Sequence, residues 1–340
     1  MKNQTRSKKR GRLEEDNTQD SDSEVCEFGS WSTWQLIDPL LPTGGFAHSG
    51  GLEAAANCGV VAGGDTRAER RGDVEVGWDV STFAKESVAN AISVNAPFIE
   101  ASRVVFLELR KDLGGLNPGE DDSSTAIDVL VTEAVKQWTK LDRRLASRVV
   151  GNQVATRAST ATGAAMLRAA SAAFGWSEDK DEETENKRSS TEYGSFFSKP
   201  LTQTFKKLKA ASRKESDRNS KLPGGHLATV FGAVCGALGF STKHTARVYT
   251  YLTLRDTLSA ATRLNLIGPL KAATELRRCV FFANAEAVKI CDKLIKTRLN
   301  AQRKGQNVGL RLTALSASTS PLVDIVQGGH DFLYSRLFNS

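Results

Sequence analysis

Apolar residues recur at helical spacing along most of this chain, and that periodicity limits the fold more than any other feature. One stripe repeats at intervals of three or four residues: Ile127, Leu130, Val131, Ala134, Val135 and Trp138. Such a stripe marks one buried face of a helix, whereas a strand alternates every second residue. Alternating segments are nearly absent. The sequence therefore predicts an all-α fold, a single helical domain of roughly eight to ten packed helices.

Other helices are expected from the same spacing and from their end signals. Asp79 is a candidate cap for a helix over 79–95, and Pro97 is expected to open the next one, because proline fits a first turn. The segment 149–174 predicts a central helix. The glycines of 227–238 predict close helix packing, and further helices are expected after Ser241 or Thr242 and over 270–299.

Polar segments divide the chain. Residues 1–30 are rich in charge and are expected to form a disordered tail, because they bury too little apolar surface to offset the entropy of ordering. Residues 31–340 are expected to form the helical domain. A second polar stretch, at about 177–223, begins with acidic residues and ends with basic ones, and it predicts a mobile insert within that domain.

Charge and cysteine content limit which class of protein this chain can be. From residue 201 onward, 22 Lys and Arg face 8 Asp and Glu, whereas the whole chain carries only +7. This basic half fits solvated helix faces or an acidic partner, and nucleic acid is disfavoured because no zinc-finger, KH or RNP pattern occurs. The five cysteines are scattered without a CxxC pair. With no secretory signal and no run of ~20 apolar residues, we expect a cytoplasmic protein that does not contact a membrane.

A glycine-rich block, LPTGGFAHSGGLE, occupies residues 41–53 after an apolar helical run. It is not a phosphate loop, because a Walker motif needs Lys followed by Ser or Thr, and the block contains no Lys. Glycine is used where the backbone takes positive φ or approaches another element closely. Two interpretations remain: a tight turn for close packing, and a shaped surface that also binds a partner.

Two further segments stand out. Residues 260–270 predict a helix that carries Arg263, a break at Gly268 and Pro269, and a new helix. The C-terminal segment 318–340 is apolar and aromatic without a packed helical pattern, so it either folds back on its own domain or docks on a partner.

Catalytic signatures are missing from the sequence. No HExxH, no GxSxG and no paired carboxylates with an evident base occur, and the four histidines are not spaced three or four residues from another His or Cys. We therefore expect a protein that is not an enzyme, with no resident metal site and no tightly bound cofactor.

Three motifs, in order, resemble the urease accessory protein UreF family, and especially its plant-like eukaryotic members. They are the block at 41–53, the pair of segments 225–232 and 263–270, and the ending around Asp324 and 330–338. The resemblance covers roughly residues 34–175 and 224–340.

The resemblance implies an all-α homodimer that binds a UreD/UreH-type accessory protein, recruits a UreG-type GTPase and docks on apo-urease. Nickel passes through the complex during insertion, and the family member modulates the GTPase without a covalent step. Motif positions suggest partner contacts at these residues: Thr43, Gly44, Gly45, Phe46, His48, Glu53, Arg263, Gly268, Pro269, His330, Asp331, Tyr334, Arg336 and Phe338.

Two alternatives stay open. One is a strict GTPase-activating protein that supplies a catalytic arginine, for which Arg263 and Arg336 are candidates. The other is a direct nickel-binding carrier.

Overall fold

The computed structural model describes residues 25–43, 45–62, 77–116, 121–175, 197–218 and 224–339. Within these ranges the chain forms eleven α-helices and no strand, which confirms the all-α prediction. The α-helices are α1 (Val25–Ile37), α2 (Leu52–Asn57), α3 (Val80–Gly114), α4 (Asp121–Val149), α5 (Gln153–Ala173), α6 (Lys199–Arg218), α7 (Leu227–Ala237), α8 (Thr242–Arg263), α9 (Pro269–Arg303), α10 (Val308–Thr313) and α11 (Pro321–Gly328). The described ranges also contain the short 3-10 helices η1 (Gly45–Ala47), which precedes α2, and η3 (Gly329–Phe332), which follows α11.

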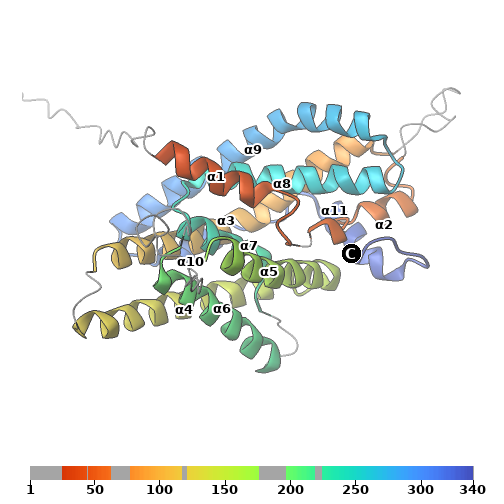
Figure 1. The fold of residues 1–340 in the computed structure, drawn as a ribbon. Coiled ribbons are helices and arrows are strands. Elements are labelled where there is room, and N and C mark those ends of the chain that lie inside the picture. Colours follow the sequence, from red (N-terminus) through yellow and green to blue (C-terminus); the bar gives the residue numbers. More distant parts are fainter. Residues whose placement is uncertain are drawn as a thin grey trace, which may run out of the picture.

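Helix α7 is the centre of the molecule. It packs on α3, α4 and α5, and every residue from Ala228 to Ala237 is buried (Figure 1). Glycines allow this approach, because a Cβ on Gly232 would lie 2.2 Å from the carbonyl oxygen of Ile99 in α3. The predicted close packing of 227–238 is therefore confirmed. The prediction that 149–174 forms the central helix is wrong, since α5 packs on α7, α6, α4 and α11 but leaves one side, with Arg157 and Arg168, exposed.

Helix α3 runs unbroken for 35 residues with Pro97 inside it. The predicted start of a new helix at Pro97 is wrong. Proline removes one backbone donor and disfavours a helix interior, but residues Ala96 to Ile99 are buried against the core, and this packing outweighs the local cost. The predicted cap is confirmed, because the Asp79 side chain accepts a hydrogen bond from Thr82 N at 2.7 Å.

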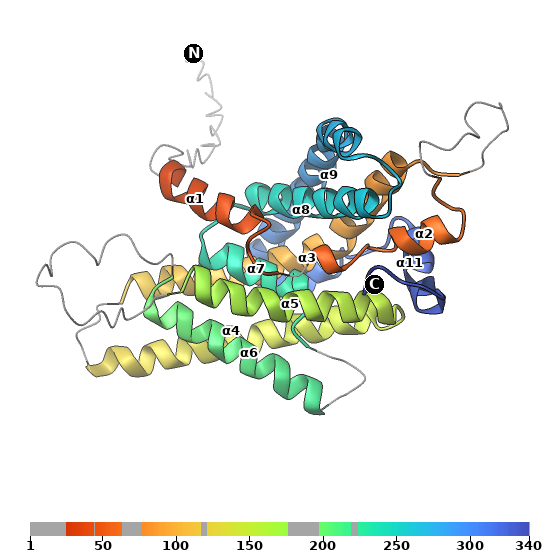
Figure 2. The same cartoon turned by 45° about the vertical axis from the view of Figure 1, so that its right-hand side comes forward.

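Helices α8 and α9 form a layer over α3 (Figure 2). A buried ionic cluster joins the three helices: Glu100 of α3 accepts hydrogen bonds from Arg103, from Thr242 at the start of α8 and from Arg298 of α9. A buried carboxylate requires such compensation, because desolvation without partners costs several kcal/mol. Helix α8 begins at Thr242, directly after Ser241 as expected, and the Ser241 side chain caps it by accepting a hydrogen bond from His244 N.

Part of the segment expected to be a mobile insert is helical. Helix α6 begins at Lys199 and buries Leu201, Phe205 and Leu208 against the core, together with Phe197 just before the helix. Phe197 and Phe205 stack with ring centroids 4.9 Å apart. The many Lys and Ser residues of this segment masked an amphipathic helix whose apolar positions recur at helical spacing. Residues 176–196 and 219–223, the rest of the expected insert, lie outside the described residues.

The N-terminal boundary also differs from expectation. Helix α1 begins at Val25, ahead of the expected domain start at residue 31, while residues 1–24 lie outside the described residues. Across the described ranges, no helix combines the length and apolar character that crossing a membrane requires.

Candidate interaction site at the C-terminal tail

The C-terminal tail folds back onto α2, the helix that follows the glycine block. Glu53 of α2 is 3% exposed, and its carboxylate accepts hydrogen bonds from the backbone N–H groups of Leu337 and Phe338. The Nε2 atom of His330, which is fully buried, lies 2.8 Å from Glu53 Oε2. A single buried carboxylate thus holds two points of the tail, and its charge is compensated by three donors.

Phe338 anchors the end of the tail. Its side chain is 5% exposed and belongs to the apolar cluster that also contains Leu52, Val61, Ile267 and Val326. The guanidinium carbon of Arg263, at the end of α8, lies 4.4 Å from the ring centroid, which is cation–π geometry. Asn339 N donates to the carbonyl oxygen of Ala47 in η1 at 2.9 Å.

A second contact fixes η3 to α5. Arg157 donates two hydrogen bonds to the carboxylate of Asp331, at 2.8 and 2.6 Å, and Arg336 donates a third at 3.3 Å. The hydrogen bonds from Arg157 lower the pKa of Asp331 below its ordinary value, and the same contact raises the pKa of Arg157. Because both side chains are partly exposed, this pair orients the tail more than it stabilises the fold.

We call the contacts of Glu53, Arg157 and Arg263 with the tail the tail latch. Between its fixed points the tail exposes three large apolar side chains: Phe332, Tyr334 and Leu337, which are 90%, 107% and 63% exposed. We call these three residues the tail patch. A set of exposed aromatic residues beside arginine has the composition of a protein–protein hot spot.

The glycine block supports the latch through its backbone. Gly50 and Gly51 have φ values of 61° and 93°, in the left-handed region that favours glycine. A Cβ on Gly51 would lie 2.9 Å from the Gln327 Cβ of α11, so the block packs closely on the helix that precedes the tail. Close packing, one of the two interpretations of this block, is therefore confirmed. Gly44 lies outside the described residues.

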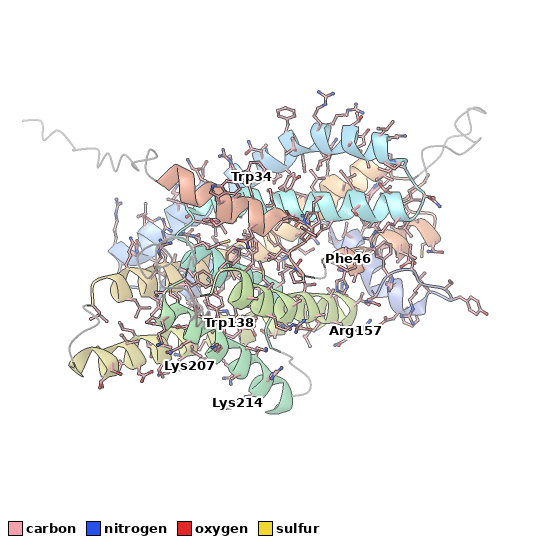
Figure 3. All side chains as sticks on the ribbon, viewed as in Figure 1. Trp34, Phe46, Trp138, Arg157, Lys207 and Lys214 are labelled. Atoms are coloured by element: carbon pink, nitrogen blue, oxygen red, sulfur yellow. The ribbon has the colours of Figure 1, made fainter. Side chains whose placement is uncertain are left out.

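The other predicted residues of the block have mixed surroundings. Phe46 is 64% exposed and points outward from η1 (Figure 3), whereas Thr43 and Gly45 are half-buried. His48 is half-buried, and burial, followed by the nearby charge of His330, lowers its pKa. The structure thus brings His48, Glu53, Arg263, His330, Asp331, Arg336 and Phe338 into one region.

Gly268 and Pro269 form the turn between α8 and α9, and both are exposed. Neighbouring Ile267 is buried in the same apolar cluster as Phe338, so the turn lies against the base of the tail through that cluster. Asn265 takes a φ of 57°, which makes the sharp end of α8 possible.

The motif at 225–232 organises the core. Buried Asp142 accepts hydrogen bonds from Gly225 N, His226 N and the Thr229 hydroxyl. Burial raises the pKa of Asp142, although the nearby His226 and these donors act in the opposite direction. A Cβ on Gly163 would lie 2.0 Å from the Gly225 carbonyl oxygen. This motif therefore joins α4, α5 and α7.

A cavity of about 800 Å³ lies between α3, α8, α11 and the start of α5. Its lining is mostly uncharged, with amide and hydroxyl groups from Ser87, Asn90, Asn152 and Tyr249, while Asp324 supplies a carboxylate. Asn90 donates to Asp324 and accepts from Ser318 Oγ, Thr319 N and Ser320 N, which fixes the loop before α11.

In the described part of the chain, no three His, Cys, Asp or Glu residues form a group able to hold a metal ion.

Sequence reasoning did not identify Arg157 and Asn90. Arg157 lies 174 residues from Asp331, and Asn90 lies 234 residues from Asp324. Neither sits in a recognisable motif, and only the folded chain places each beside its partner.

The fold and the site define an all-α protein whose N-terminal glycine block and C-terminal tail are joined at one surface. Similarity to known proteins gives the family. The sequence model of the UreF family matches residues 124–280. Urease accessory protein F of Oryza sativa subsp. indica is 32% identical over 308 residues, which cover 91% of this chain and 84% of the rice protein.

Two other relatives extend over nearly the whole chain. Urease accessory protein F of Arabidopsis thaliana is 30% identical over 96% of this chain and 100% of its own length. Urease accessory protein 6 of Cryptococcus neoformans var. grubii is 27% identical over 90% of this chain and 95% of its own length. The chain belongs to the UreF family, as the three sequence motifs indicate.

Proposed function

We propose that this protein acts in urease maturation as a non-enzymatic scaffold. Its relatives in rice and Arabidopsis are named urease accessory protein F, and each of them matches most of this chain. The observation that carries the proposal is the tail patch: Phe332, Tyr334 and Leu337 stay exposed while the backbone on both sides of them is held by the latch. A surface that is ordered before binding loses less conformational entropy when a partner docks.

In this proposal the tail patch and Phe46 contact a UreD/UreH-type accessory protein. The homodimeric assembly then recruits a UreG-type GTPase and modulates it on apo-urease. Nickel passes through the complex as cargo, without a resident site on this chain. The turn at Gly268 and Pro269 and the exposed edge of Arg263 supply further contact surface beside the latch.

The test is co-purification of the full chain with its UreD/UreH-type and UreG-type partners. Changing Phe332 and Tyr334 to Ala removes exposed aromatic surface and leaves the latch intact, so we expect the complex to be lost while the chain stays folded. The matched control is Phe281→Ala on α9, which is 75% exposed and lies outside the tail. Equal recovery of the complex with both variants would exclude the tail patch from the interface.

Variants of the residues that hold the tail test whether the tail must be ordered before it binds, as distinct from which side chains touch the partner. Phe338→Ala removes the buried anchor, and Arg336→Ala removes the weakest bond to Asp331. If the tail must be ordered before it binds, Phe338→Ala weakens co-purification although its ring is covered in the free protein. Unchanged binding by both variants would show that the order of the tail does not matter.

The arginine-finger alternative is tested separately. Arg263 stacks on Phe338 and Arg336 bonds Asp331, so either residue would have to leave a contact to reach a phosphate. Single-turnover GTP hydrolysis with Arg263→Lys and Arg336→Lys distinguishes the two functions, because a catalytic arginine finger increases the hydrolysis rate by a factor of about 10³–10⁵. A scaffold residue changes affinity for the GTPase instead.

The nickel-carrier alternative predicts stoichiometric nickel on the isolated chain. Equilibrium dialysis of the full chain with Ni²⁺, followed by elemental analysis, measures this directly. Retention of one nickel ion per chain at micromolar free metal would favour the carrier, whereas retention only in the presence of the partners favours the scaffold.

A further inference from the structure

Helix α6 carries a continuous basic face on the outside of the molecule. Beyond Phe205, five of its exposed or half-exposed positions are basic: Lys206, Lys207, Lys209, Arg213 and Lys214. With 100° per residue they fall on one side of the helix, opposite the buried Leu201, Phe205 and Leu208. Lys207 and Lys214 lie on this outer helix in Figure 3, and α6 stays at the edge of the molecule in both ribbon views.

Among the side chains that the structure describes, the positive charge of this face is largely uncompensated. Lys207 pairs with Asp128 of α4 at 3.0 Å, but the two side chains are 45% and 71% exposed. Among the residues that the structure describes, no ion pair involves Lys206, Lys209, Arg213 or Lys214. The pair with Asp128 shows the chemistry that the face accepts, and an exposed pair of this kind exchanges for another carboxylate at little cost.

The face is also rigid. Phe205 and Leu208 are completely buried, and the ring of Phe205 packs on both Phe197 and Phe106. The cations therefore sit at fixed spacing along a straight rod, from Lys206 to Lys214 over about 12 Å at 1.5 Å per residue. Fixed spacing favours a partner that is itself regular.

We infer that the basic face of α6 is a docking surface for an acidic helix of a protein partner. Carboxylates repeated every three or four residues along such a helix match cations that recur at the same interval on α6. Single-stranded nucleic acid is less suited to this surface, because its sites combine cations with aromatic platforms. The exposed or half-exposed positions of α6 between the cations are Ala210, Ala211 and Ser212, which are not aromatic. This surface is separate from the tail patch, so its failure would leave the proposed scaffold role untouched.

The test measures binding by fluorescence anisotropy at low salt. The probe is a labelled helical peptide of about 20 residues with Glu at every third and fourth position; its twin carries Lys at those positions. The full chain is compared with a K206E/R213E/K214E variant and with a K293E/K296E/K304E variant on α9 and its C-cap, which changes the net charge by the same amount. Circular dichroism confirms that all three proteins are folded.

We expect the Glu peptide to bind the unmodified chain, to lose at least about tenfold in affinity for the α6 variant and to change less than about twofold for the α9 variant. The Lys peptide should bind only the α6 variant. Equal losses in both variants would show a response to net charge alone and would overturn the inference. A single-stranded RNA of equal charge that binds more tightly than the peptide, and loses affinity in the α6 variant, would assign the face to nucleic acid instead.

Discussion

The imidazole of His330 lies 2.8 Å from the carboxylate of Glu53, a residue 277 positions earlier in the chain, and both side chains are buried. The same carboxylate binds the backbone of Leu337 and Phe338, so one charge near the N-terminal end of the domain orders its C-terminal end. This arrangement, its surroundings and the burial of cysteines in the core lead to four measurable predictions.

Replacing Glu53 by Gln should release the tail. The amide keeps the size of the carboxylate but offers one acceptor oxygen for three donors, and breaking a buried ionic contact in this way costs about 3 kcal/mol of the free energy of unfolding. Urea denaturation and hydrogen exchange of the Leu337 and Phe338 amides measure the two effects. The control is Glu286→Gln, whose pair with exposed Lys289 is 3.6 Å long and should contribute less than about 1 kcal/mol. Tail amides that stay equally protected in Glu53→Gln would rule out Glu53 as the anchor.

Two neighbouring glycines should respond differently to alanine. Gly50 has a φ of 61° and open space where a Cβ would lie, so Gly50→Ala should cost only the strain of a left-handed residue, about 1–2 kcal/mol. Gly51 has a φ of 93° and faces Gln327 at 2.9 Å, so Gly51→Ala adds a steric clash of about 1–3 kcal/mol. Urea unfolding of both variants tests whether Gly51→Ala lowers the free energy of unfolding more than Gly50→Ala does. Equal destabilisation would mean that α11 moves freely away from the block.

Docking of η3 should weaken in acid. The Arg157 hydrogen bonds lower the pKa of Asp331 below its ordinary 3.8. A carboxyl with a lowered folded pKa stabilises the docked state above its unfolded pKa, and this contribution is lost as the pH falls through the folded pKa. The contribution of Asp331 to docking should therefore be constant from pH 7 to about pH 4 and decline below it. Carboxyl NMR titration gives the pKa, which should rise in Arg157→Gln and change less in Arg336→Gln; identical titration curves in all three proteins would contradict the assignment.

The buried thiols should resist modification in the folded protein. Burial raises the pKa of Cys235 to about 12 and that of Cys291 to about 11, and Cys279 is 1% exposed. Since the thiolate is the reactive form, only a very small fraction reacts at pH 8. In a Cys26→Ser/Cys58→Ser variant, we expect Ellman's reagent to detect no thiol until denaturant is added. Rapid reaction under native conditions would show that the core opens near α7 or α9.

Local signals predicted much of this fold correctly. The apolar stripes predicted the helices because each helix must bury one face. Asp79 was recognisable as a cap because its side chain satisfies a free backbone N–H group at the start of α3. The helix start predicted at Pro97 was wrong, because the local preference of proline for a first turn was outweighed by the burial of α3 on both sides of Pro97. Helix α6 was missed because its many charged residues concealed the buried positions Leu201, Phe205 and Leu208.

In the candidate site, too, the sequence predicted some features and only the folded structure showed the others. Glu53, Arg263, His330 and Phe338 were selected individually from motifs, yet their assembly into one latch was not predictable, and Arg157 carried no signal at all. By itself, the sequence determined the helical class, the UreF resemblance and the glycine block, because these depend on spacing and on residue type along the chain. Only the tertiary structure decided that the tail returns to α2, because that outcome depends on a buried carboxylate finding its donors across 277 residues of sequence.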